Sequence, residues 1–350
     1  MVEGRQNRRQ GQGANVATGG PHIPVMLDPV LTAMAAGEGD VIVDATFGAG
    51  GYSRALLDQG AQLYAVDRDP DALVGAAPLQ AKYPEQLVLL SGRFSQVEHL
   101  LSAHDIERVD AIVADIGVSS MQIDQADRGF SFLRNGPLDM RMAQTGPSAA
   151  DVVNHVARPD LTRIIGILGE ERQASRVAAE IAARREKAPF ETTEQLAACV
   201  ESVIGRRGGD KIHPATRTFQ ALRIYVNREL EELAELLLAS ERLLVPNGRL
   251  VIVTFHSLED RLVKKFFQDR SEQTSGSRHL PPQQTVDPTF VCPKRTAIKA
   301  ERHEIADNSR ARSAKLRFGL RTQAAPRAGD LSLFGLPNLP ALDALKGMGA

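Results

Sequence analysis

Short runs of β-branched and other apolar residues alternate along the chain with helical patterns. The strand candidates are residues 41–45, 62–67, 86–90, 110–115 and 249–255. Runs that are apolar on both faces and separated by helices predict a parallel sheet with helices on each side. A sixth candidate, residues 311–320, alternates polar and apolar positions, which predicts a last strand.

The interval between the fourth and fifth strands is too long for a simple crossover. It holds about 130 residues, whereas a βαβ crossover needs roughly 30. Apolar spacing predicts a helix over residues 170–187, and Thr192 with Gln195 reads as a capping box that opens a second helix ending near Gly205. A crossover helix over residues 216–244 then ends at a Pro-Asn-Gly turn, residues 246–248.

These elements predict an α/β, mostly parallel and doubly wound sheet domain of residues 21–139 and 213–321. A helical subdomain for substrate recognition, residues 140–212, is inserted into it. Residues 1–20 and 322–350 are rich in small or polar residues and are expected to be flexible tails.

Composition narrows the class of protein. Hydrophobic residues make up 43% and the net charge is −1, which excludes a wholly basic nucleic-acid coat and an acidic disordered chain. The two cysteines, Cys199 and Cys292, form no CxxC pair, which excludes a disulfide framework and a cysteine-rich zinc module and fits a reducing cytoplasm. No apolar run approaches about 18 residues, and no apolar stretch follows the basic N-terminus, so neither a membrane span nor a secretory signal is expected.

A glycine-rich loop follows the first strand, in the order Asp44-Ala-Thr-Phe-Gly-Ala-Gly-Gly. Glycines let the backbone turn tightly and approach a ligand, and the following helix offers free N–H groups. Asp67 ends the second strand about 20 residues later, where an acid can bind both hydroxyls of a ribose. The loop fits the D-x-x-x-G-x-G pattern of S-adenosylmethionine (SAM) methyltransferases better than the dinucleotide pattern, because Ser53 replaces the third glycine. Asp44 suits a cationic cofactor and would repel a pyrophosphate, but an NAD(P) oxidoreductase stays open as an alternative.

Asp115 ends the fourth strand and is the candidate for the reaction centre. A carboxylate there can accept the N–H bonds of an exocyclic base amine and direct its lone pair at the methyl donor. The Asp-Ile-Gly-Val sequence departs from the Asp/Asn-Pro-Pro-aromatic motif of familiar amino-methyltransferases, so a positioning role is favoured over general-base catalysis. The alternative is that Asp115 only caps the following turn. We expect Asp67 and Asp115 on neighbouring strand tips, forming a cradle for the sulfonium.

Ordered motifs along the chain resemble the ribosomal RNA small subunit methyltransferase H family, also called the MraW family. They are His22-Ile-Pro-Val-Met-Leu, the Asp44 loop, Asp115-Ile-Gly-Val-Ser-Ser, Arg128-Gly-Phe-Ser-Phe, Gly136-Pro-Leu-Asp-Met-Arg, Gly169-Glu-Glu-Arg, His213-Pro-Ala-Thr-Arg-Thr-Phe, Asn227-Arg-Glu-Leu and Phe255-His-Ser-Leu-Glu-Asp-Arg. The resemblance covers about residues 22–321.

The resemblance implies a class I SAM-dependent methyltransferase that methylates N4 of a cytidine in 16S rRNA, in the decoding region of the small ribosomal subunit. The family's cofactor contacts fall on Gly50, Gly51, Tyr52, Asp67, Phe94, Asp115 and Gln122. Tyr52 stands where the family usually has His. A cofactor contact made by the backbone would be kept after this change, whereas a side-chain contact would be altered.

Two histidines are further candidates. His213 begins the crossover helix and His256 follows the fifth strand, and both are expected to open onto the crevice that holds Asp115. Each could be structural, contact RNA or remove a proton, and His256 is the candidate for a catalytic residue. No third ligand stands at metal spacing, so no metal is expected.

RNA contacts must come from local charge. Residues 294–321 hold nine basic and three acidic side chains, which suits phosphate binding, although a solvated face is the alternative. Arg172, Arg176 and Arg184 are expected to face solvent. The near-zero net charge favours the assembled subunit over naked rRNA as substrate. A non-catalytic RNA-binding scaffold is the remaining rival.

Overall fold

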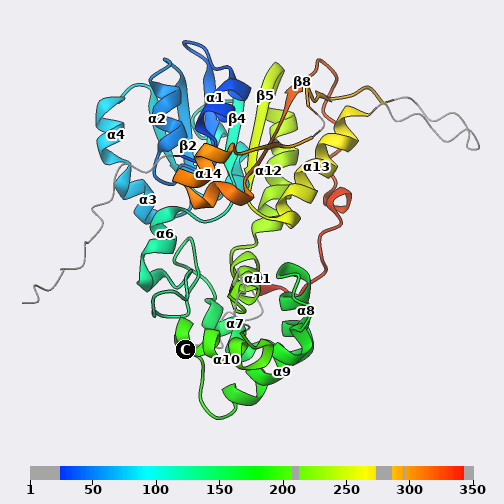
Figure 1. Cartoon of the computed structure of the whole chain (residues 1–350). Coiled ribbons are helices and arrows are strands. Elements are labelled where there is room, and N and C mark those ends of the chain that lie inside the picture. Colours follow the sequence, from blue (N-terminus) through cyan, green and yellow to red (C-terminus); the bar gives the residue numbers. More distant parts are fainter. Residues whose placement is uncertain (1–23, 207–212, 273–285, 295, 343–350) are drawn as a thin grey trace, which may run out of the picture.

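The computed structural model describes residues 24–206, 213–272, 286–294 and 296–342. Its centre is a sheet of order β3-β2-β1-β4-β5-β8-β6, with β7 also paired to β8 (Figure 1). The first five strands in this order are parallel, and β8 is antiparallel to β5. The strands are β1 (Val41–Asp44), β2 (Gln62–Asp67), β3 (Leu87–Ser91), β4 (Val109–Asp115), β5 (Leu244–Thr254), β6 (Phe290–Val291), β7 (Ile298–Lys299) and β8 (Lys315–Arg321). The doubly wound, mostly parallel sheet expected from the sequence is confirmed.

Helices cover both faces of the sheet, because alternate strand residues are buried in two separate cores. In β1, Ile42 and Val43 are both fully buried but belong to different cores. The α-helices are α1 (Leu27–Met34), α2 (Gly51–Leu57), α3 (Pro70–Gly75), α4 (Ala77–Lys82), α5 (Val97–Ser102), α6 (Ser120–Asp124), α7 (Ala149–His155), α8 (Arg158–Leu168), α9 (Ala174–Arg185), α10 (Thr193–Ile204), α11 (Thr216–Asn227), α12 (Glu229–Leu243), α13 (Ser257–Ser271) and α14 (Arg302–Asp307). Short 3-10 helices are η1 (Phe94–Gln96), η2 (Ala126–Arg128), η3 (Ser309–Ser313) and η4 (Leu331–Phe334).

The predicted crossover helix is two helices. Arg228 separates α11 from α12 with a left-handed φ of 52°. The side chain of Asn227 holds this break, since its amide nitrogen donates to the carbonyl of Met140 at 2.7 Å and its oxygen accepts from the N–H of Met142 at 2.9 Å. The turn expected at residues 246–248 lies within β5, which starts at Leu244 and pairs with β4 across a register shift.

Other boundaries differ by a few residues. Residues 311–313, expected in the last strand, belong to η3, and residues 170–173 precede α9. The predicted capping box of Thr192 and Gln195 is present at the start of α10.

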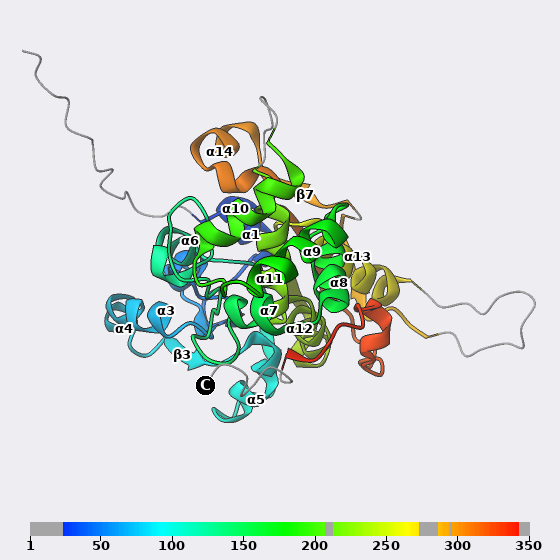
Figure 2. The ribbon, with the colours of Figure 1, turned by 90° about the horizontal axis from the view of Figure 1, so that it is seen from below.

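Helices α7 to α10 lie together beyond the carboxyl ends of the strands (Figures 1 and 2). Helix α11, outside the predicted insertion of residues 140–212, packs against α8 and α7, and the apolar core runs continuously from these helices to the sheet. The helical insertion therefore shares its core with the sheet domain. Its boundaries stay a proposal, and residues 207–212 lie outside the described residues.

Residues 322–342 differ from the flexible tail expected from their composition. Phe334 is buried and stacks at 6.5 Å on Phe266, and the hydroxyl of Tyr225 donates to the carbonyl of Pro340 at 2.9 Å. The segment is held by these long-range contacts, which composition does not reveal. The tail expected over residues 1–20 lies outside the described residues. Among the helices that are described, none is both long and apolar enough to cross a bilayer.

Candidate active site

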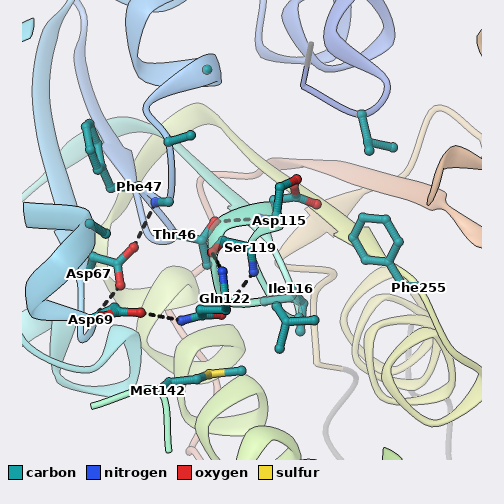
Figure 3. Close-up of a pocket in the computed structure, with 18 of the residues that line it drawn as sticks. Thr46, Phe47, Asp67, Asp69, Asp115, Ile116, Ser119, Gln122, Met142 and Phe255 are labelled. Atoms are coloured by element: carbon teal, nitrogen blue, oxygen red, sulfur yellow. Dashed lines mark hydrogen bonds between the residues drawn. The ribbon is translucent and has the colours of Figure 1, made fainter. Parts of the chain in front are cut away.

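A cavity of about 590 Å³ opens at the carboxyl ends of the strands. The chain leaves β1 for β2 and β3 on one side and returns to β4 on the other, and open α/β sheets bind ligands at such a switch point. The cavity is lined by the loops after β1, β2 and β4, with Phe255 on another wall (Figure 3). Of the predicted site residues, Gly51, Tyr52, Asp67, Phe94, Asp115 and Gln122 line it.

Three carboxylates stand around the end of β1. Asp44 pairs in register with Ala65 of β2 and with Val113 of β4. Asp67 and Asp115 each lie two residues beyond these partners, so they flank the end of β1 at the same level. The expectation of neighbouring strand tips was wrong, since β1 lies between β2 and β4, but both carboxylates face one cavity.

The glycine loop is shaped by close contacts. Gly50 has a φ of 73°, and a Cβ there would meet the ring of Phe47 at 2.8 Å. A Cβ on Gly51 would meet Pro24 at 2.2 Å. These glycines therefore let the loop turn under Phe47 and Pro24, two side chains of the cavity wall. Gly50 itself is not among the lining residues, so its contribution is the turn.

Asp67 is fixed by backbone donors. Its two carboxylate oxygens accept from the N–H groups of Gly48 and Asp69, both at 2.8 Å. A carboxylate has about four lone-pair positions, so two remain for a ligand. Burial is the main cause that raises the pKa of Asp67.

Gln122 is engaged on both ends of its amide. Its nitrogen donates to Asp69 at 2.7 Å, and its oxygen accepts from the N–H of Ser119 at 3.0 Å (Figure 3). The side chain therefore joins the tips of β2 and β4. A cofactor contact by Gln122 stays a prediction, and the geometry supports a positioning role.

Asp115 is partly buried, and its carboxylate is incompletely paired. Its N–H donates to Thr46 Oγ1 at 2.7 Å, which ties β4 to the glycine loop, while its carboxylate oxygen Oδ1 has no hydrogen-bond partner. Burial, followed by the charges of Asp44 and Glu259, raises the pKa of Asp115 well above its usual value. An unpaired buried carboxylate is costly unless a donor or a cation faces it.

Asp44 is a second carboxylate of this cavity that a cation would stabilise. Its carboxylate accepts from the hydroxyl of Ser53 at 2.7 Å and from the N–H of Thr46 at 3.1 Å. Burial nevertheless raises the pKa of Asp44 to about 6, with a smaller contribution from Asp67. Bringing a positive charge into the cavity would stabilise the ionised form of Asp44, Asp67 and Asp115 together.

Tyr52 fills a structural position. The residue is buried on α2, and its hydroxyl donates to the carbonyl of Val25. This bond anchors the segment after Pro24 over the cavity. Phe94, after β3, presents an aromatic surface to the cavity.

Neither predicted histidine lines the cavity, so the expectation of a shared crevice was wrong. The Nδ1 of His213 accepts from the N–H of Ala215 at 3.1 Å, and its ring lies 4.6 Å from that of Phe132. His256 caps α13, and its Nε2 lies 2.8 Å from Oε1 of buried Glu259. Each imidazole is held by its own helix start, which residue spacing alone does not show.

One group of side chains in the described residues has metal-ligand types. Ligand atoms of Glu229, His256 and Glu259 lie within 4.8 Å of one another. The guanidinium of Arg223 already donates to both oxygens of Glu229 at 2.8 Å and lies 3.8 Å from Glu259. The group is therefore an ion-pair network whose positive charge is an arginine.

Arg128 is a site residue whose role the sequence did not reveal. Its guanidinium donates to Asp69 at 2.8 Å and to Asp71 at 3.0 Å, and also to the carbonyls of Arg141 and Met142, both at 3.0 Å. It fastens the loop that carries Met142 to the tip of β2. The sequence signal that could have pointed to this residue was the Arg128-Gly-Phe-Ser-Phe motif.

Comparison with known proteins agrees with this geometry. The model of the MraW methylase family matches residues 19–321. The chain belongs to the MraW methylase family. The ribosomal RNA small subunit methyltransferase H of Mesorhizobium japonicum is 57% identical over 325 residues, covering 92% of this chain and 94% of that protein. Its counterpart in Sinorhizobium fredii is 56% identical over 341 residues, covering 97% and 99%.

As a member of this family the chain is a methyltransferase. Solved structures similar to it include the N-methyltransferase NodS of Bradyrhizobium japonicum (TM-score 0.40, 8% identity, 85% of this chain and 94% of that one). Another is an rRNA methylase of Streptococcus thermophilus (TM-score 0.34, 11% identity, 85% and 93%). The class I SAM-dependent methyltransferase fold, with its inserted helices, rests on the sheet topology and on the family.

Proposed function

We propose that the chain transfers the methyl group of SAM to the exocyclic N4 of a cytidine in 16S rRNA, in the decoding region of the small ribosomal subunit, in the cytoplasm. The observation that carries the cofactor assignment is the set of three carboxylates around one cavity, one buried and two partly buried, whose pKa values are raised. A sulfonium offsets this charge, whereas a pyrophosphate would add to it.

The cavity residues fit the parts of SAM. The two unused lone pairs of Asp67 are available to ribose hydroxyls, and Phe94 offers a surface for adenine. When bound, SAM supplies an electrophilic methyl group. Asp44 and Asp115 contribute the negative charge that favours a cation.

Asp115 is assigned to the target amine. Its unpaired Oδ1 can accept an N–H of the amine, which orients the nitrogen lone pair. Because its pKa is raised, Asp115 is also a suitable acceptor for the proton that N4 loses. His256, paired with Glu259 and off the cavity wall, is less well placed for this step.

The basic segment of residues 294–321 supports RNA binding only in part. Lys315 and Arg317 are committed to Asp260, at 2.8 and 2.7 Å. Arg310 lines the cavity. Among the described residues of this segment, the exposed cations that are available to phosphates include Lys294, Lys299, Arg302 and Arg312.

Two measurements test the proposal. Calorimetry with SAM and with NADH should show binding of SAM alone, and binding of NADH alone would favour an oxidoreductase. Radiolabelled SAM with small subunits or with protein-free 16S rRNA, followed by nucleoside digestion, should give N4-methylcytidine, with subunits as the better substrate.

The substitution Asp115→Ala should abolish transfer while RNA binding persists. An unchanged rate of transfer in this variant would overturn the assignment of Asp115. RNA binding by wild-type protein without any transfer would favour the scaffold function.

A further inference from the structure

A second cavity, of about 460 Å³, adjoins the cofactor cavity and is lined by four arginines. They are Arg68 after β2, Arg93 after β3, Arg141 in the loop after η2, and Arg228 between α11 and α12. Of the described residues that line it, none is acidic. We call this cavity the arginine pocket.

Two of these arginines share one buried acid. Glu232 lies 3.2 Å from Arg93 and 3.9 Å from Arg68, and it also accepts from the hydroxyl of Ser95 at 2.8 Å. The side chain of Arg68 is only 10% exposed, and its Nε is buried without a hydrogen-bond partner. Burial, with the charge of Arg93, lowers the pKa of Arg68. The carboxylates of Glu232, Glu229 and Asp67 act in the opposite direction, and Arg68 also donates to the carbonyl of Asn227 at 2.9 Å.

The other two arginines come from the segments that Asn227 joins. Arg141 is held by Asp139, at 3.0 Å from its Nε, and by the carbonyl of Gly146 at 3.0 Å. Arg228 is exposed, at the left-handed break between the helices. Among the described residues, Glu232 and Asp139 form ion pairs with three of these four arginines. Arg228 forms no ion pair there, although its charge acts on the nearby Glu231.

We propose that the arginine pocket binds a phosphate group, supplied by the backbone of the RNA strand that the enzyme methylates. Several guanidinium groups around one site match phosphate, because each can donate two parallel hydrogen bonds. A phosphate would also offer an acceptor to the buried Nε of Arg68, which has no hydrogen-bond partner.

The position of the pocket favours RNA as the source. Arg68 lines both cavities, and Arg93 faces the pocket while its neighbours Gly92 and Phe94 line the cofactor cavity. A phosphate here would therefore lie beside the residues assigned to the ribose and adenine of the cofactor, at the rim of the cavity in which the RNA base must be placed. This source rests on the proposed function, whereas the phosphate chemistry does not. Free inorganic phosphate is the other source of the same group.

The variants Arg93→Gln and Arg228→Gln test the pocket. Arg228 is exposed, so its replacement leaves the buried ion pairs intact, and Arg176→Gln is a matched control because Arg176 is exposed on α9. The probes are a fluorescent oligocytidylate dodecamer, measured over a range of salt concentrations, and inorganic phosphate measured by calorimetry. SAM affinity and thermal melting report whether each variant remains folded.

Each pocket variant should weaken RNA binding roughly tenfold and reduce the slope of log K against log salt by about 0.7, with unchanged SAM affinity. Arg176→Gln should bind RNA as wild type does. A different result is that wild-type protein binds inorganic phosphate saturably, while the variants lose this binding and keep their RNA affinity. That result would support a phosphate site in the pocket but would assign it to free phosphate and not to RNA.

If RNA and phosphate binding were both unaffected by either substitution, the proposal would be overturned. If wild-type protein bound RNA through these arginines but formed no N4-methylcytidine, the proposed function would fail and the phosphate site would stand. If methylation were unaffected and RNA affinity did not depend on either arginine, the proposed function would stand and the RNA-phosphate site would fail.

Discussion

Binding of SAM should release protons near pH 6, because the cavity holds carboxyl groups with raised pKa values. The pKa of Asp44 lies at about 6, so about half of this group is protonated at pH 6. A positive charge within about 4–6 Å lowers a carboxyl pKa by about 1–3 units. A shift of only about one unit leaves roughly a tenth protonated and releases about 0.4 proton from Asp44.

The sign follows from the charge of the ligand. Protonated carboxyls must ionise to stabilise the sulfonium, so SAM affinity should rise with pH through about 6 and then level off. Burial also raises the pKa of Asp115 well above its usual value, so a cation beside this carboxyl favours its ionised form too.

The measurement is calorimetry at pH 6 in phosphate, MES and bis-Tris, whose ionisation enthalpies differ. The slope of the observed binding enthalpy against buffer enthalpy gives the protons released. S-adenosylhomocysteine is the matched ligand control, since its sulfur is uncharged, and Asp44→Asn is the matched protein control. Both should release fewer protons than SAM with wild-type protein. A slope of zero for SAM, or equal slopes for the two ligands, would refute the electrostatic reasoning.

Three further predictions concern stability and metals. Arg128→Gln should lower the free energy of unfolding by about 3 kcal/mol in urea titrations, because it leaves the buried carboxylate of Asp69 without its cation; an unchanged midpoint would contradict this. Thr192→Ala should lower it by about 1 kcal/mol through loss of the α10 capping box, and Thr192→Ser should restore most of the loss. Because Arg223 already pairs with Glu229 at 2.8 Å and lies 3.8 Å from Glu259, dialysis against EDTA should leave methyl transfer unchanged. A loss of activity that zinc restores would show that a metal acts there.

Local patterns along the chain were sufficient to predict the strands and the acidic residues at their carboxyl ends. Each parallel strand is a short apolar run with a polar residue at its carboxyl end, and parallel pairing brings such ends to one edge of the sheet. The positions of Asp67 and Asp115 on one cavity therefore followed from the sequence. The Thr192 capping box was predictable for the same reason, since its partners lie three residues apart.

Features that depend on distant partners were decided by the tertiary structure. The break at Arg228 depends on Asn227 bonding to a loop more than 80 residues away in the sequence, and residues 322–342 are ordered by contacts with α11 and α13. The arginine pocket collects side chains from four separate loops. No local periodicity encodes such meetings, because they arise only when the sheet order and the helical insertion bring these segments together.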